Sequence, residues 1–195
     1  MNLFHEEHLL DNLTTNLRQI SPGAAMVSAS MATSLQMYSG EELSVEYARL
    51  FLGPFETKVP PYGSIYLNEE RMVMGDSTME IIRFYEEMGL SRDKDCLDLP
   101  DHIAVELELM SYLIYKEAEA LEKSDFATAL DMIKKQKSFL DQFLGRWIVE
   151  FCDKIKASTD NGFYLALADC ASLFVSNYNP DHAIETLGKE VFLAS

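Results

Sequence analysis

Residues that could do chemistry gather at one expected helix start, where Asp98, Pro100, Asp101 and His102 lie within five positions. Carboxylates beside an imidazole can bind a basic group or hold a metal ion. A simpler role is also open, because Pro suits the first turn of a helix and Asp can cap its unpaired N–H groups. Residues 179–182 (Asn-Pro-Asp-His) repeat the pattern before another helix-like run. The local string alone therefore does not separate a binding site from a helix cap.

The helix behind this cluster is expected over residues 98–121. Its apolar face is predicted from residues that recur at helical spacing, namely Ile103, Leu107, Met110, Leu113, Ile114, Ala118 and Leu121. A charged face is expected opposite them, made of Glu106, Glu108, Lys116, Glu117 and Glu119. Helical spacing places Glu106 on one face with His102 and Glu108 with Asp101. We therefore add both glutamates to the candidate site.

The elements around this helix are also expected to be helical, over residues 1–20, 24–38, 41–51, 76–88, 125–157, 163–175 and from 180 onward. The 125–157 run is one helix bent at Gly145 or two helices. Proline and glycine forbid a helix at the start of residues 53–75, which are expected to form a long ordered loop with brief extended pieces at 64–67 and 72–74. The sequence thus predicts an all-α, single-domain bundle of about eight to ten helices over residues 1–195, with a candidate hinge near residues 122–126.

Bulk composition limits the partners. The chain has 195 residues, 48% of them hydrophobic, and a formal net charge of −16. That charge disfavours nucleic acid and anionic membranes and favours solubility or a basic partner. The three cysteines form no C-x-x-C pair, the first residues carry acids where a secretory signal is basic, and no apolar run is long enough to span a bilayer. A cytoplasmic protein without stable membrane insertion is expected.

Motifs of catalysis and cofactor binding are missing from the sequence. It contains no phosphate-binding G-x-x-x-x-G-K-[ST] loop, no H-E-x-x-H, no E-x-x-H pair of a di-iron bundle and no G-x-S-x-G turn. His102 and Glu106 lie four residues apart and could in principle hold a metal. We expect no enzyme, no cofactor and no metal. The alternative that stays open is a small-molecule- or metal-binding all-α protein that uses Asp101, His102 and Glu106.

Three stretches, in this order, resemble a known family. They are Glu46-Tyr47-Ala48-Arg49-Leu50-Phe51-Leu52-Gly53-Pro54, then Pro60-Pro61-Tyr62-Gly63-Ser64-Ile65-Tyr66 with its continuation to Leu90, then residues 100–110, which begin Pro-Asp-His. Together they resemble the TorD/DmsD/NarJ family of redox-enzyme maturation chaperones, on its TorD/DmsD side. The resemblance runs over roughly residues 41–175.

The resemblance implies an all-helical cytoplasmic chaperone. Such a protein binds the catalytic subunit of a molybdenum-cofactor oxidoreductase and its twin-arginine leader peptide, assists cofactor insertion and delays export. Carried over by position, it implies leader binding by Asp101 and His102, and less directly by the loop residues Pro60, Tyr62, Ser64 and Tyr66. It is compatible with a monomer or with a dimer that exchanges C-terminal helices. This context favours a site at the first Pro-Asp-His string and leaves the second string, at residues 180–182, as a cap.

Overall fold

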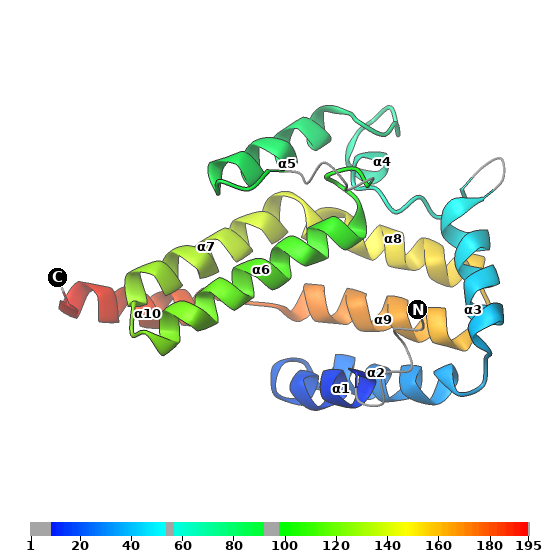
Figure 1. The fold of residues 1–195 in the computed structure, drawn as a ribbon, viewed down its shortest axis with the longest axis horizontal. Helices are drawn as coiled ribbons and strands as arrows, with labels where there is room; N and C mark the ends of the chain where they lie inside the picture. The colour runs from blue at the N-terminus through cyan, green and yellow to red at the C-terminus, as the bar shows by residue number, and fades with distance from the viewer. Residues whose placement is uncertain (1–8, 54–56, 92–97, 195) are drawn as a thin grey trace. The chain divides into compact units, whose positions relative to one another are not determined.

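The computed structural model describes residues 9–53, 57–91 and 98–194, and in these ranges the chain is all-α, as the sequence predicts (Figure 1). The described residues form ten α-helices and one π-helical turn, and the only β-type pairing within them is an isolated bridge between Tyr62 and His102. None of these helices is both long and apolar enough to cross a bilayer. The elements are α1 (Leu9–Ile20), α2 (Pro22–Leu35), α3 (Gly40–Tyr47), η2 (Ala48–Leu52), α4 (Ser64–Leu67), α5 (Asp76–Glu87), α6 (Ile103–Glu122), α7 (Phe126–Gln142), α8 (Leu144–Ser158), α9 (Gly162–Asn177) and α10 (Asp181–Ala194).

The chain divides into two compact units. The first comprises Met1–Pro61 and Ile148–Tyr178, and the second comprises Tyr62–Trp147 and Asn179–Ser195. The first unit therefore holds α1 to η2, most of α8, and α9, whereas the second holds α4 to α7 and α10. The hinge expected near residues 122–126 falls inside the second unit, and its motion stays a prediction.

In the first unit, α2 packs between α1 and α9 (Figure 1). Small side chains make this close packing feasible: Ala24 and Ala25 are buried with Leu17 of α1 and Cys170 of α9. The Cys170 thiol lies 3.7 Å from the Ala24 carbonyl oxygen. The alanine- and serine-rich composition of residues 24–38 thus corresponds to tight helix packing.

Residues 46–53 have a structural role in the first unit. Arg49 forms an ion pair with Glu46, and its guanidinium also donates a hydrogen bond to the Ser158 carbonyl at 2.6 Å. Hydrogen bonding to Arg49 is the largest cause of a lowered Glu46 pKa. The same arginine therefore joins the end of α3 and η2 to the C-terminal end of α8.

In the second unit, α6 and α7 form an antiparallel helical hairpin, and α10 packs on α7 (Figure 1). Ala120, Ala129, Ile133 and Leu187 form a buried cluster among the three helices. The hairpin turns at Ser124, which has a positive φ of 56°. The next residue, Asp125, accepts a hydrogen bond from the Thr128 N–H and so caps α7.

Three expectations about the connections between helices are corrected. Residues 64–67 are helical rather than extended, and residues 73–74 form a turn. In residues 125–157 there are two helices, and the break is at Phe143 (φ −125°, ψ −98°) rather than at Gly145. Gly145 belongs to α8, and a Cβ atom there would lie 2.5 Å from the Leu140 carbonyl oxygen. This glycine therefore permits the tight passage from α7 to α8.

The expectations for residues 98–121 also need correction. The helix begins at Ile103, and its buried residues are Glu106, Leu109, Met110, Leu113 and Ala120. Leu107, Ile114 and Leu121, expected in the packed face, are 43%, 40% and 39% exposed. Glu106, expected on the charged face, is 1% exposed. Apolar residues occupy more than one side of α6, so hydropathy alone could not decide which side packs against α7.

Candidate site at the start of helix α6

Asp101 caps helix α4 and not α6, the helix that follows it in the chain. Its carboxylate Oδ2 accepts the Ser64 N–H at 2.8 Å, and its backbone carbonyl accepts the Gly63 N–H at 2.8 Å. Ser64 is the first residue of α4, where backbone N–H groups have no partner within the helix. Asp101 therefore supplies acceptors to the first turn of α4 and is 2% exposed as a result. This contact joins the Pro-rich loop to the Pro-Asp-His string.

His102 is the N-cap of α6. Its Nδ1 accepts the Ala104 N–H at 3.2 Å, so a neutral ring carries its proton on Nε2. The imidazole meets the Tyr62 ring edge to face, with centroids 5.2 Å apart, and the backbones of the two residues form the isolated bridge. Burial lowers the pKa of His102, although the negative charges of Asp98 and Asp101 act in the other direction and raise it. The ring therefore stays neutral over a wider pH range than an exposed histidine.

Glu106 reaches into the unit one helical turn beyond His102. Trp147 at the start of α8 donates its Nε1–H to the two carboxylate oxygens at 3.3 and 3.1 Å. Burial raises the Glu106 pKa well above its ordinary value, Asp101 raises it further, and the Trp147 hydrogen bond opposes the shift. Tyr66 of α4 stacks on the indole with centroids 5.3 Å apart. Glu106 and Trp147 thus form a buried group, on which the half-buried Tyr66 packs.

Two further residues complete this region. Gly63 lies so close to the buried group that a Cβ atom there would be 3.1 Å from both the Glu106 Oε1 and the Trp147 Nε1. The Tyr85 hydroxyl of α5 donates to the Pro100 carbonyl at 2.8 Å, and burial holds its pKa above the usual range. Neither residue was singled out from the sequence, and neither was Trp147 as a site residue. The one available signal was that Trp147 is the only tryptophan in the chain.

Some buried polar atoms here have no hydrogen-bond partner within the described residues. One is the second carboxylate oxygen of Asp101, Oδ1, and another is the hydroxyl of Ser64. The others belong to the C-cap of α4 and the first turn of α5: Asn68 Nδ2, Ser77 Oγ and Thr78 Oγ1. Because an unsatisfied buried polar atom is costly, a bound group that donates to Asp101 Oδ1 would remove that cost.

The structure brings together most of the residues singled out from the sequence. Those gathered in the second unit at the start of α6 are Tyr62, Ser64, Tyr66, Asp101, His102 and Glu106. Pro60 is half-buried and lies in the first unit, two residues before Tyr62. Glu108 is exposed on α6. The Tyr66 ring packs on Trp147 of its own unit.

The second Pro-Asp-His string differs in its surroundings. Asn179 accepts the Asp181 N–H at 2.9 Å and so caps α10, as expected. Asp181 is exposed and forms a 3.2 Å ion pair with Lys137 of α7. His182 is exposed as well. The two strings therefore share a sequence but not an environment, since only the first has a buried carboxylate.

Metal binding at this cluster gains no support. In the part of the chain that the structure describes, no three side chains of His, Cys, Asp or Glu come close enough to hold a metal ion. His102 Nδ1 and the Glu106 carboxylate already have donors in Ala104 and Trp147.

Substitution of Gly63 tests the close packing of this region. Gly63→Ala is expected to lower the free energy of unfolding by about 1–3 kcal/mol, because the new methyl group overpacks against Glu106 and Trp147. Gly188→Ala in α10 is the matched control, since nothing lies within 4 Å of a Cβ atom there. It should be neutral or stabilising by up to about 1 kcal/mol. Urea unfolding followed by circular dichroism measures both, and equal effects would contradict the packing described.

Comparison with known proteins agrees with this architecture. Residues 17–153 match the family described as nitrate reductase delta subunit. The chaperone protein TorD of Photobacterium profundum is 31% identical over 125 residues, which cover 64% of this chain and 56% of the relative. The perchlorate reductase assembly chaperone of Dechloromonas aromatica is 28% identical over 176 residues, 88% of this chain and 76% of the relative. The Tat proofreading chaperone DmsD of Salmonella typhimurium is 26% identical over 171 residues, which cover 88% of this chain and 77% of the relative.

The all-helical fold and the family match over residues 17–153 thus define the family of this chain. The chain belongs to the TorD/DmsD family of maturation chaperones, within the nitrate reductase delta subunit family. Its matches to two TorD proteins span 56% and 60% of those relatives' length. The relatives are named as chaperones and not as catalysts, which agrees with the expectation that the chain is not an enzyme.

Proposed function

We propose that this protein is a cytoplasmic chaperone for the catalytic subunit of a molybdenum-cofactor oxidoreductase. In this proposal it binds the twin-arginine leader and the body of the subunit, assists cofactor insertion and delays export until the subunit is folded. The names of the relatives support the proposal, since they refer to reductase assembly and to Tat proofreading. It acts as a monomer or as a helix-exchanged dimer, for which the α6–α7 turn at Ser124 is the candidate hinge.

The observation that carries the proposal is the unpartnered Asp101 Oδ1. One oxygen of this carboxylate is fixed by the Ser64 N–H, and the other has no hydrogen-bond partner within the described residues. An arginine guanidinium offers several N–H donors and a positive charge, so it can satisfy that oxygen and neutralise the carboxylate at once. Access to a side chain that is 2% exposed requires the Pro-rich loop to move away from it.

Neighbouring groups suit a peptide as well. A neutral His102 with its proton on Nε2 can donate to a peptide carbonyl, and Tyr62 beside it offers an aromatic surface. The net charge of −16 raises the rate of encounter with a basic segment.

The two Pro-Asp-His strings provide a matched test. Asp101→Asn combined with His102→Ala is expected to weaken binding of a synthetic peptide, an arginine pair followed by an apolar run, by about 10- to 100-fold, because the desolvated charge is lost. Asparagine keeps the acceptor for Ser64, so the helix content should not change. Asp181→Asn with His182→Ala is the control and should leave the affinity unaltered, since both side chains are exposed. Calorimetry measures the affinities; equal binding by both double variants would remove Asp101 and His102 from the site.

A further inference from the structure

The first unit has a cavity that opens beside helix α3. Figure 1 shows α3 lying across the C-terminal end of α8 and the start of α9, and the Tyr164 hydroxyl of α9 donates to the Leu43 carbonyl of α3 at 2.8 Å. The cavity has a volume of about 370 Å³ and is lined by Tyr38, Glu41, Glu42, Val45, Glu46 and Asn161. All six residues belong to the first unit, so this cavity is not part of the candidate site at the start of α6.

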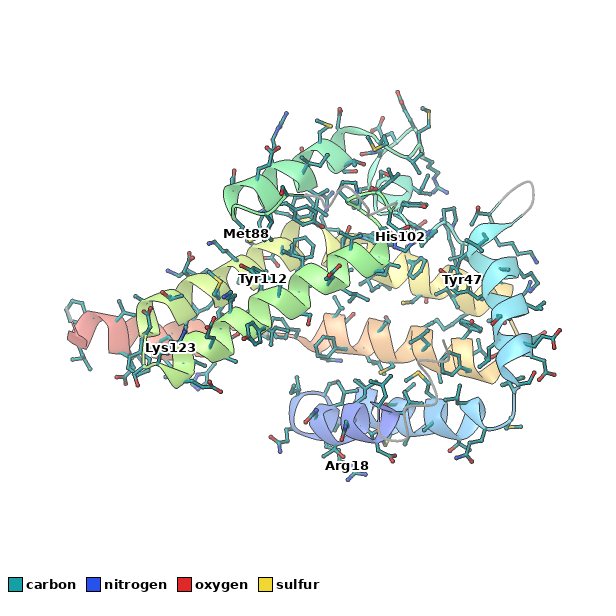
Figure 2. All side chains as sticks on the ribbon, viewed as in Figure 1. Arg18, Tyr47, Met88, His102, Tyr112 and Lys123 are labelled. Atoms are coloured by element: carbon teal, nitrogen blue, oxygen red, sulfur yellow. The ribbon has the colours of Figure 1, made fainter. Side chains whose placement is uncertain are left out.

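Helical spacing along α3 brings the side chains of this cavity together. Glu42 and Glu46 are four residues apart and therefore lie on one side of the helix. Glu41 and Val45 are likewise four residues apart and form the neighbouring row. Figure 2 labels Tyr47, the last residue of α3, which directly follows this set. The cavity thus combines an acidic row with a second row that has one acidic and one apolar member.

Glu46 is neutralised within the protein. It forms an ion pair with Arg49, and the Thr159 hydroxyl donates to the same carboxylate. Hydrogen bonding to Arg49 lowers the pKa of Glu46 most, and the positive charge of Lys58 acts in the same direction. Glu46 therefore forms a fixed wall of the cavity, because a ligand that competes for its carboxylate would have to displace Arg49.

Glu41 and Glu42 carry charges that the protein does not neutralise. Neither residue has an ion-pair partner within the described residues. The Ser39 N–H and hydroxyl donate to the Glu42 Oε2 at 2.7 and 2.8 Å, and these hydrogen bonds lower the pKa of Glu42. Glu42 is therefore ionised at neutral pH, and its other carboxylate oxygen accepts no hydrogen bond from the residues that the structure describes. The charge open to a ligand at this cavity is negative.

The rest of the lining suits a carbon chain. Val45 is 63% exposed, so its side chain is available to a ligand. The Tyr38 ring is held in place because its hydroxyl oxygen accepts the Gly162 N–H at 3.1 Å. An aromatic ring can contact both methylene groups and a cation. The Asn161 Oδ1 already accepts two N–H groups of the first turn of α9, at 3.0 and 3.4 Å, so it is fixed as well.

Size and charge narrow the class of ligand. An inorganic cation would fill a small part of the cavity, since one water molecule takes about 30 Å³ of the liquid. Across the described ranges, no three side chains of His, Cys, Asp or Glu are close enough to hold a metal ion. An anion is disfavoured by Glu41 and Glu42. A protonated amine on an alkyl chain has both the charge and the apolar surface that the lining requires.

We propose that this cavity binds an organic ammonium ion, that is, one or two protonated amino groups on an unbranched carbon chain. Glu41 and Glu42 bind the amino group, and the methylene groups lie against Val45 and Tyr38. Two sources share this chemistry, a free linear diamine and the lysine side chain of a partner protein. The inference does not rest on the proposed function, since it concerns another unit and another ligand.

Three small probes test the inference with the full chain. They are cadaverine (a linear five-carbon diamine), N-acetyl-lysine amide, and pentanol, which has the carbon chain without the charge. Cadaverine is expected to bind at least about 10-fold more tightly than pentanol and to shift the amide resonances of Val45 and Gly162. Combining Glu41→Gln with Glu42→Gln should weaken cadaverine binding by about 10-fold or more, because the charge-assisted contacts are lost. Glutamine at position 42 can still accept the Ser39 N–H, so α3 stays capped.

Glu86→Gln with Glu87→Gln is the matched control, since it removes the same charge from an adjacent, exposed pair at the end of α5 in the second unit. It should leave cadaverine binding unaltered. Equal losses in the two double variants would reveal a general effect of net charge and overturn the inference. Failure of both amines to bind, or equal binding of pentanol and cadaverine, would overturn it too. Preference for cadaverine over N-acetyl-lysine amide would support a free diamine as the ligand, and comparable binding of the two would support a partner's lysine.

Discussion

Replacement of Trp147 by alanine is expected to lower the free energy of unfolding by about 3–5 kcal/mol. The indole is fully buried, stacks on Tyr66 and donates its N–H to Glu106. The substitution removes the largest side chain of this region and also leaves the Glu106 carboxylate without its donor. Denaturant unfolding followed by far-ultraviolet circular dichroism measures the loss.

Two further variants separate the parts of this effect. Trp147→Phe keeps an aromatic ring but removes the N–H, and is expected to cost about 1–3 kcal/mol through the unsatisfied carboxylate. Combined with Glu106→Leu, which removes that carboxylate, the same change should cost less. Tyr115→Ala is the control for loss of an aromatic ring, since Tyr115 is 64% exposed, and should stay within about 0.5 kcal/mol of the wild type. A Trp147→Ala variant as stable as the Tyr115 control would show that the buried group is not formed in solution.

Replacement of Glu106 by glutamine is expected to make the protein more stable at pH 8 than the wild type. Burial raises the pKa of Glu106 in the folded state above its ordinary value of 4.5. Above pH 4.5 the unfolded chain loses this proton while the folded chain keeps it. The stability of the wild type therefore falls as the pH rises from 4.5 toward the folded-state pKa, by up to about 1.4 kcal/mol per pH unit. Glutamine is neutral throughout and can still accept the Trp147 N–H.

The difference between variant and wild type isolates this group. His102 has a lowered pKa, so it contributes stability that is lost as the pH falls through its titration range, but it does so equally in both proteins. The gain of Glu106→Gln should shrink as the pH falls from the folded-state pKa of Glu106 toward 4.5. Glu108→Gln, at an exposed position on the same helix, removes the same charge and serves as the control. Parallel stability profiles for wild type and Glu106→Gln would contradict a buried, protonated Glu106.

The sequence was sufficient for the local features of the fold. Helical spacing predicts α2, α5, α9 and α10 close to their observed bounds, because each depends on periodicity and on nearby helix-breaking residues. It also predicts the end of α1 at Ile20, whereas the expected start of that helix, at residues 1–8, lies outside the described residues. Caps at Asp125 and Asn179 were equally accessible, since the side chain and the N–H it accepts lie within three residues. Interactions of this kind are encoded in a few neighbouring positions.

Long-range partners could not be predicted in the same way. Asp101 looks like the cap of the helix that follows it, yet it caps α4, whose first residue lies 37 positions earlier. Glu106 looks like a surface residue on helical spacing, but the indole of Trp147, 41 positions later, stabilises its burial. The site became recognisable from sequence only through the resemblance of whole stretches, which was sufficient to group Tyr62, Ser64, Asp101 and His102.

The contact between Ser64 and Asp101 also has a consequence for how the chain folds. Helix α4 has four residues, far too few to persist alone, because a first helical turn fixes several backbone dihedrals for one hydrogen bond. Asp101 supplies the oxygen that accepts the Ser64 N–H at the start of α4. Helix α4 can therefore form only after the segment between Ser64 and Asp101 has closed into a loop. Closing the loop between Ser64 and Asp101, which are 37 positions apart, costs more chain entropy than a single hydrogen bond can offset. Docking of the loop and ordering of the start of α6 are therefore one cooperative event, and a ligand that favours either one orders both.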